Sequence, residues 1–273
     1  MPVQLTRTDR SMHSGLLLSR GVRLVRTSAA LVLLAFPSFV AAQSPREART
    51  EGGAWFAYTG IHPISEKWRW QIEGQVRQTD GVNKPSQRLY RTALLRTLNS
   101  ATRIGLGYAF AQTHPPAEFV ADPQLFHEHR IYEQLDLKLP TGPVVVDNRV
   151  RLEQRWSERV GTGDEAGEHL GWTYTNRARY NLKGTIAPGG GAPKDGKPYL
   201  FASDEVFVSF GKNVRYNVFD QNRLIGGVGF RFSKKLSAEL SYLNQIVIRS
   251  NGVDEERHNI LVVGFSSEAP IHW

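Results

Sequence analysis

The sequence predicts an all-β protein, namely a single closed antiparallel transmembrane β-barrel of about 12 strands, with 10 as the fallback. Polar and apolar residues alternate with a period of two along most of the chain, as in KWRWQIEGQVRQ at 67–78. Such alternation is typical of β-strands, because successive side chains point to opposite faces. Short and long connections also alternate between these segments, and an export signal precedes them.

The first 42 residues read as a cleaved signal peptide. Three arginines precede an apolar run at 28–42, which contains Pro37 and ends in small residues. This order of charge, apolar core and small residues is typical of a secretory signal, and the run is too short to span a bilayer stably. We therefore expect cleavage after Ala42, with a retained anchor as the alternative. A flexible leader at 43–53 and a barrel over 54–273 would follow.

Composition excludes several classes of function. The 273 residues contain no cysteine, so neither a disulfide framework nor a thiolate metal site is possible. Removing residues 1–42 takes away five arginines and one aspartate, which lowers the formal charge from +8 to +4. No basic tail or cluster remains that would indicate nucleic-acid binding. No motif indicates a cofactor, and GGGAPKDG at 189–196 lacks the spacing of a phosphate-binding loop.

Period-two segments of about ten residues give the expected strands, and no window has a convincing helical period. Eleven are visible, whereas single-chain bacterial barrels have an even number. We therefore expect a further strand near the N-terminus or within the final EAPIHW. The segments are 54–62, 66–79, 86–98, 101–113, 126–139, 143–157, 169–186, 197–210, 219–233, 235–249 and 257–267.

The connections fit an outer-membrane barrel, in which tight turns lie on one side and longer loops on the other. The short connections are HPISE, NSA, PTG and SKK, and the long ones are TDGVNKPS, THPPAEFVADPQL, ERVGTGDEAGE and SNGVDEER. The stretch at 187–198 breaks the pattern, because it is long where a short turn is expected.

The two strand faces differ in chemistry. One face carries tryptophan, tyrosine and aliphatic residues, and the other is dense in arginine and glutamate. A secreted β-sandwich would also alternate, and it remains an alternative. Aromatic residues near strand ends favour a membrane barrel with interfacial girdles. We thus expect Trp68, Trp70 and Val76 to face lipid, and Arg69, Glu73 and Arg77 to face the lumen.

The residues expected to line the lumen form an arginine–glutamate ladder. One interpretation is structural, since interlocked ion pairs could fill a narrow barrel. The other is a narrow channel, which would prefer anions because arginine exceeds glutamate. The candidates are Glu73, Arg77, Glu128, Arg130, Arg149, Arg151, Glu153, Arg155, Arg177, Arg179, Glu205, Gln221, Arg223 and Glu239.

Histidines 127 and 129 raise a third possibility. His127 and His129 share one strand face, while Glu128 points the other way. Two ligands without a third make a poor metal site, so they are weak metal candidates and we expect no bound metal. An outer-membrane hydrolase acting on lipid or envelope would need serine, histidine and a supporting carboxylate or amide. No HxS or GxSxG element occurs, so we expect no enzymatic activity and keep the hydrolase as an alternative.

Several stretches together resemble an uncharacterised proteobacterial family, domain of unknown function 2490. They are AWFAYTG with KWRWQIEGQVR, HEHRIYEQLDLKLP with NRVRLEQRW, TNRARYNL, and SDEVFVSFG with FDQNRLIGGVGFRFSKKLSAELSYLNQ. They cover about 54–265. The resemblance implies an outer-membrane β-barrel and no known activity or catalytic residues. We accordingly expect the outer membrane as location, with its lipid and assembly machinery as partners and any small solute unidentified. The terminal Trp273 resembles the signal read by that machinery.

Overall fold

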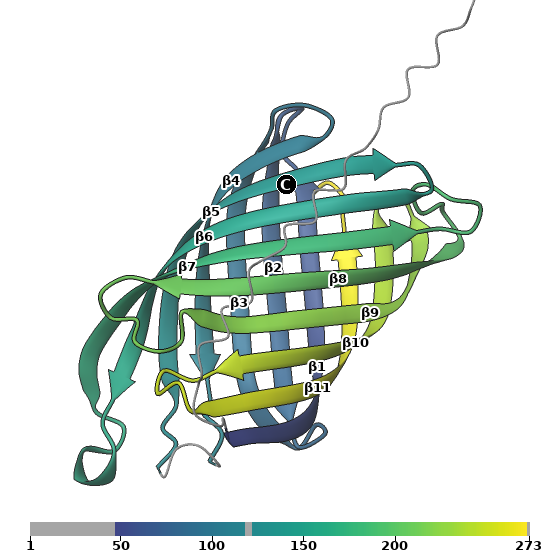
Figure 1. The fold of residues 1–273 in the computed structure, drawn as a ribbon. Coiled ribbons are helices and arrows are strands. Elements are labelled where there is room, and N and C mark those ends of the chain that lie inside the picture. Colours follow the sequence, from purple (N-terminus) through teal and green to yellow (C-terminus); the bar gives the residue numbers. More distant parts are fainter. Residues whose placement is uncertain (1–46, 118–121, 272–273) are drawn as a thin grey trace, which may run out of the picture. The chain divides into compact units, whose positions relative to one another are not determined.

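The computed structural model describes residues 47–117 and 122–271. The expected signal peptide and Trp273 lie outside these residues. The described chain forms one closed β-barrel, and each strand pairs with its neighbours in sequence (Figure 1). The all-β closed-barrel prediction is thus confirmed. The strands are β1 (Glu47–Pro63), β2 (Trp68–Thr79), β3 (Lys84–Thr97), β4 (Thr102–Thr113), β5 (Phe126–Thr141), β6 (Val144–Val160), β7 (His169–Ile186), β8 (Lys197–Phe210), β9 (Phe219–Ser233), β10 (Leu236–Ile248) and β11 (Asp254–Ser267).

The strand count corrects the prediction of 12 or 10. The described residues form eleven strands, and β1 pairs with β11 in parallel, from Glu47 opposite Asp254 to Gly60 opposite Ser267. In a meander every connection reverses direction, so an odd number of strands leaves the first and last parallel. All other pairs are antiparallel. No twelfth strand forms in 268–271. Instead, β1 begins at Glu47, inside the stretch expected to be a flexible leader.

The connections separate the barrel into two ends. We call one the turn end, with connections at 64–67, 98–101, 142–143, 187–196 and 234–235. The loop end carries 114–125, 161–168, 211–218 and 249–253, and also the short turn at 80–83. That turn was expected to be a long loop. It is tight because Asp80 (φ 52°) and Gly81 (φ 70°) both adopt the left-handed backbone that hairpin turns favour.

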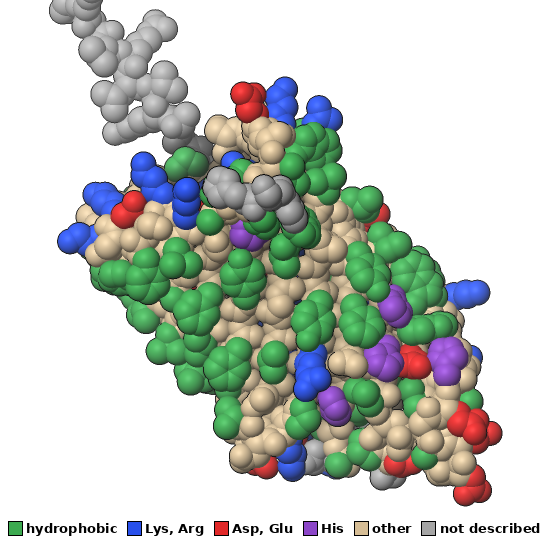
Figure 2. Space-filling view, turned by 180° about the vertical axis from the view of Figure 1, so that it is seen from behind, with side chains coloured by type: hydrophobic (Ala, Val, Ile, Leu, Met, Phe, Trp, Pro, Cys, Tyr) green, Lys and Arg blue, Asp and Glu red, His purple; other side chains and the backbone are tan. Residues whose placement is uncertain are grey.

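The outer face of the barrel is apolar. Figure 2 shows hydrophobic side chains spread over this face, with charged side chains mainly at its two ends. Trp68 and Val76 are each 39% exposed, whereas Glu73 is 5% exposed. This distribution is the reverse of a water-soluble protein, and the closed sheet rules out the β-sandwich alternative. The outward apolar side chains include Phe56, Tyr58, Tyr90, Leu94, Leu106, Tyr108, Ile131, Leu152, Trp172, Tyr180, Leu182, Leu200, Leu224, Val228, Leu240, Tyr242, Leu261 and Phe265.

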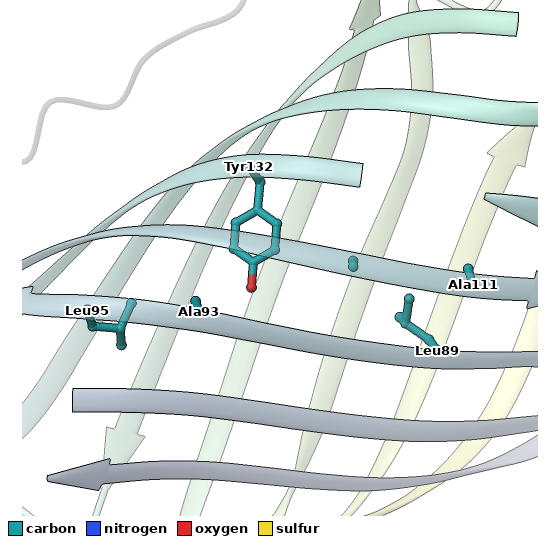
Figure 3. Packing of buried hydrophobic residues seen from close by; sticks show 6 residues of the cluster. Leu89, Ala93, Leu95, Ala111 and Tyr132 are labelled. Atoms are coloured by element: carbon teal, nitrogen blue, oxygen red, sulfur yellow. The ribbon is translucent and has the colours of Figure 1, made fainter. Parts of the chain in front are cut away.

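Part of the inner face is also apolar. Leu89, Ala93, Leu95 and Tyr132 pack together on the inner side of β3–β5 (Figure 3). The Tyr132 ring lies over Gly107, where an added Cβ would come within 2.3 Å of the ring. Glycine in this strand therefore makes room for a bulky inward side chain. In the described part of the chain, no helix is long and apolar enough to cross a membrane.

Candidate functional site

The lumen is the candidate site, because alternate residues of every strand bring charged side chains into it. The fourteen residues named from the sequence lie on this inner face. Eleven are buried, and Arg149, Arg155 and Glu239 are half-buried. Charged side chains are rarely buried unless they are paired. The positions therefore demand ion-pair partners within the barrel.

The centre of the lumen holds a network in which each carboxylate serves several arginines. Glu153 accepts hydrogen bonds from Arg177 Nε (2.9 Å), Arg177 Nη2 (2.6 Å) and Arg179 Nη1 (2.7 Å). Arg179 Nη2 also donates to Glu205 (2.6 Å). Such charge-assisted contacts are the strongest hydrogen bonds that side chains make. Together they tie β6, β7 and β8.

Other contacts cross the lumen between strands that are not neighbours. Arg151 Nη2 of β6 donates to Glu73 of β2 at 3.0 Å, although three strands separate them along the wall. Lys183 Nζ of β7 donates to Glu239 of β10 at 2.6 Å. Along the wall, Glu73 also accepts a hydrogen bond at 2.5 Å from Arg91 Nη1 on the neighbouring strand β3. These bridges fill the barrel interior with paired charge, as the structural interpretation of the ladder requires.

Aromatic side chains inside the lumen support the arginines. The guanidinium carbon of Arg77 lies 4.0 Å from the Trp55 ring centroid, and that of Arg223 lies 5.2 Å from it. The Phe207 ring faces three guanidinium groups, including Arg179 at 4.6 Å and Arg223 at 4.8 Å. Cations over aromatic faces are stabilised by the ring quadrupole, more so away from water. These contacts fix the arginine side chains in place.

Sequence reasoning missed several lumen residues. Trp55 and Phe207 were overlooked because only polar and charged residues were sought, although Phe207 shares the strand parity of Glu205. Arg91 lies on the inner face of β3 between the apolar residues Leu89 and Ala93, so alternation of polar and apolar residues did not identify it as a lumen residue. Other missed polar residues, all buried, include Gln71, Gln134, Asp136, Asp220, Gln245 and Glu256.

A cavity of about 400 Å³ lies in the lumen at the loop end. Side chains of the central network form its base, and Ser86, His114 and Ser250 lie at its rim. Eight arginines line it but only three carboxylates, Glu128, Asp220 and Glu256. Glu73, Glu153 and Glu205 do not line the cavity but pair with Arg91, Arg177 and Arg179, so its surroundings keep a smaller net positive charge.

The two histidines singled out from the sequence lie on the outer face near the loop end. Figure 2 shows histidines gathered on part of this face. His127 Nδ1 is hydrogen-bonded to Glu158 at 2.6 Å, and His169 Nδ1 to the other Glu158 oxygen at 2.8 Å. His129 instead contacts the Tyr108 hydroxyl at 2.5 Å. Across 47–117 and 122–271, no group of three or more histidine and acidic residues has the arrangement of a metal site.

Comparison with known proteins identifies relatives to which no function is assigned. A family model described as "Protein of unknown function (DUF2490)" matches residues 52–257. An uncharacterized protein of Methylorubrum extorquens (strain AM1) is 27% identical over 209 residues, which cover 75% of this chain and 82% of that protein. No solved structure matches.

Proposed function

We propose that this chain, which belongs to the DUF2490 family, is an integral outer-membrane β-barrel whose lumen is closed by ion pairs. The inverted distribution of side chains carries the proposal. Aromatic and aliphatic side chains cover the outside, while Glu73, Arg151 and Glu153 are 5% exposed or less inside. Lipid favours that arrangement, and a closed barrel pairs every backbone group that lipid cannot solvate. The proposal assigns no catalytic reaction to the chain.

The connections support an orientation for the barrel. In outer-membrane barrels short turns face the periplasm and longer loops face outward. We therefore place the loop end outside the cell and the turn end in the periplasm. The long 187–196 connection is the exception at the turn end.

Fractionation of cells that express the full chain tests the membrane proposal. A folded barrel resists detergent until it is heated, so boiled and unboiled samples should migrate differently on a denaturing gel. We expect a heat-modifiable band in the outer-membrane fraction. A soluble band without a mobility shift would overturn the proposal.

Conductance in planar bilayers distinguishes a closed lumen from the narrow anion-preferring channel. The Arg151–Glu73 bridge crosses the lumen with side chains 2% and 5% exposed. We expect native protein to be silent, since side chains obstruct the path. The double variant Arg151→Ala and Glu73→Ala removes the bridge and should show discrete openings. Large, anion-selective steps in the native protein would instead establish the channel.

A further inference from the structure

The loop-end cavity contains more positive charge than its own carboxylates can neutralise. Eight arginines line a space of about 400 Å³, and three carboxylates line it with them. Glu73, Glu153 and Glu205 pair with these arginines from outside the lining, so eight arginines face six carboxylates and an excess of two positive charges remains. Most arginines of a packed lumen would be expected to pair with acids, because an uncompensated buried charge is costly. Ion pairing within the packed lumen therefore does not explain the arginines that lack a carboxylate partner.

Arg77 and Arg223 account for this excess, because the other six arginines each have a carboxylate partner within 3.0 Å. Arg77 donates to amide oxygens rather than to a carboxylate, with Nη1 at 2.8 Å from Gln87 Oε1 and Nη2 at 2.7 Å from Gln75 Oε1. Arg223 lies 3.7 Å from its nearest carboxylate oxygen, on Glu205. Both side chains line the cavity, and they are 7% and 8% exposed.

Unpaired donors point to a missing acceptor at the same place. The Nε atoms of Arg223 and Arg91 are buried and have no hydrogen-bond partner. Arg91 also lines the cavity and is 6% exposed. Buried donors left unpaired are uncommon in folded proteins, because desolvation without a partner is unfavourable. An anion within the cavity would satisfy them.

The geometry limits the kind of anion. A guanidinium group is a planar fork that matches the oxygens of phosphates and carboxylates. The Trp55 ring contacts both arginines, with its centroid 4.0 Å from the guanidinium carbon of Arg77 and 5.2 Å from that of Arg223. The cavity volume falls in the range of small-molecule sites. Two excess arginines close together favour a compact, multiply charged ligand.

We propose that the loop-end cavity is a binding site for a small phosphate-type oxyanion, held chiefly by Arg77 and Arg223. This inference rests on the proposed outer-membrane barrel, in which the cavity opens to the outside of the cell. The phosphate group could belong to a free solute or to a lipid headgroup. The enclosed position inside the lumen favours the free solute.

Calorimetric titration of the full chain, folded in zwitterionic detergent, tests this site. The probe is inorganic pyrophosphate at constant ionic strength. The test variant combines Arg77→Gln and Arg223→Gln. The control is Arg159→Gln, because Arg159 is exposed near the loop end and does not line the cavity. The heat-dependent gel shift without ligand checks that each protein is a folded barrel.

We expect saturable binding of one pyrophosphate to the native protein and to the control. Binding to the double variant should weaken at least about tenfold, the loss that removal of one charge-assisted hydrogen bond produces. If the double variant loses its gel shift, Arg77→Lys replaces it. That variant keeps the positive charge but loses the planar guanidinium group, and it should bind pyrophosphate several-fold more weakly than the native protein.

Equal binding by native and variant proteins would overturn the site, as would absence of saturable binding to the native barrel. Detergent micelles doped with phosphatidate provide the second arm. Binding to phosphatidate but not to pyrophosphate would overturn the assignment to a free solute. Failure of the barrel proposal can be distinguished from failure of the binding site, because the native protein would then lack the gel shift altogether.

Discussion

Replacing Glu153 by glutamine should strongly destabilise the barrel. The Glu153 side chain is 1% exposed and accepts three hydrogen bonds from Arg177 and Arg179, at 2.6–2.9 Å. The substitution keeps the shape but removes the negative charge between two buried guanidinium groups. Breaking a buried ion pair on one side costs about 3–5 kcal/mol. Each kcal/mol lowers the unfolding midpoint of a chain this size by about 2–4 °C. We therefore expect a fall of roughly 6–20 °C.

The assay is the temperature at which the folded band converts to the unfolded band on a denaturing gel. Glu165→Gln is the matched control, because Glu165 is exposed in the 161–168 loop. Exposed substitutions change stability by about 0.5 kcal/mol or less, so this midpoint should move by about 2 °C at most. If the two variants had the same unfolding midpoint, the Glu153 network would not stabilise the closed lumen.

Two further substitutions test packing on either face of the wall. Gly107→Ala places a Cβ 2.3 Å from the Tyr132 ring and should lower the free energy of unfolding by about 1–3 kcal/mol. In the control Gly226→Ala the added Cβ meets nothing within 4 Å. Equal free energies of unfolding for these two variants would refute the close contact. Val228→Arg, on the apolar outer face, should cost about 2–4 kcal/mol in lipid vesicles, while Val82→Arg in the exposed 80–83 turn should be nearly neutral. Chemical denaturation measures both pairs, and a neutral Val228→Arg would argue against lipid contact.

Alternation in the sequence was enough to predict the fold class and the content of each face over much of the wall. In 68–77 one parity holds Trp68 and Val76, and the other holds Glu73 and Arg77. A barrel that lies in a membrane has lipid on one face of each strand and a polar lumen on the other, and this difference in polarity would select such alternation. The same contrast brought most of the central ion-pair network into the candidate set.

Where both faces of a strand are apolar, alternation in the sequence did not show which residues face the lumen. Both faces of β3 carry apolar residues, with Leu89 and Leu95 inside and Tyr90 and Leu94 outside, so Arg91 could not be assigned. Local patterns also lack information on register. A shift between Phe207 and Val208 in the β8–β9 pairing accompanies the burial of the adjacent Asp220 and Gln221.

Closure depends on pairing between the two ends of the chain. The parallel pairing of β1 with β11 joins residues about 200 positions apart, such as Gly53 and Ile260. The even-strand rule for bacterial barrels pointed to 12 instead. No local signal in 43–53 marked the start of a strand at Glu47.

The most direct test of the central claim asks which residues touch lipid. The chain has no cysteine, so single cysteines can be introduced at Val228, Leu152 and Glu165 and labelled with an environment-sensitive fluorophore before refolding into vesicles. With brominated lipids, we predict strong quenching at Val228 and Leu152, which are 50% and 45% exposed on the outer face, and none at Glu165 in its loop. Equal fluorescence at all three positions, unaffected by bromine, would contradict an outer face solvated by lipid.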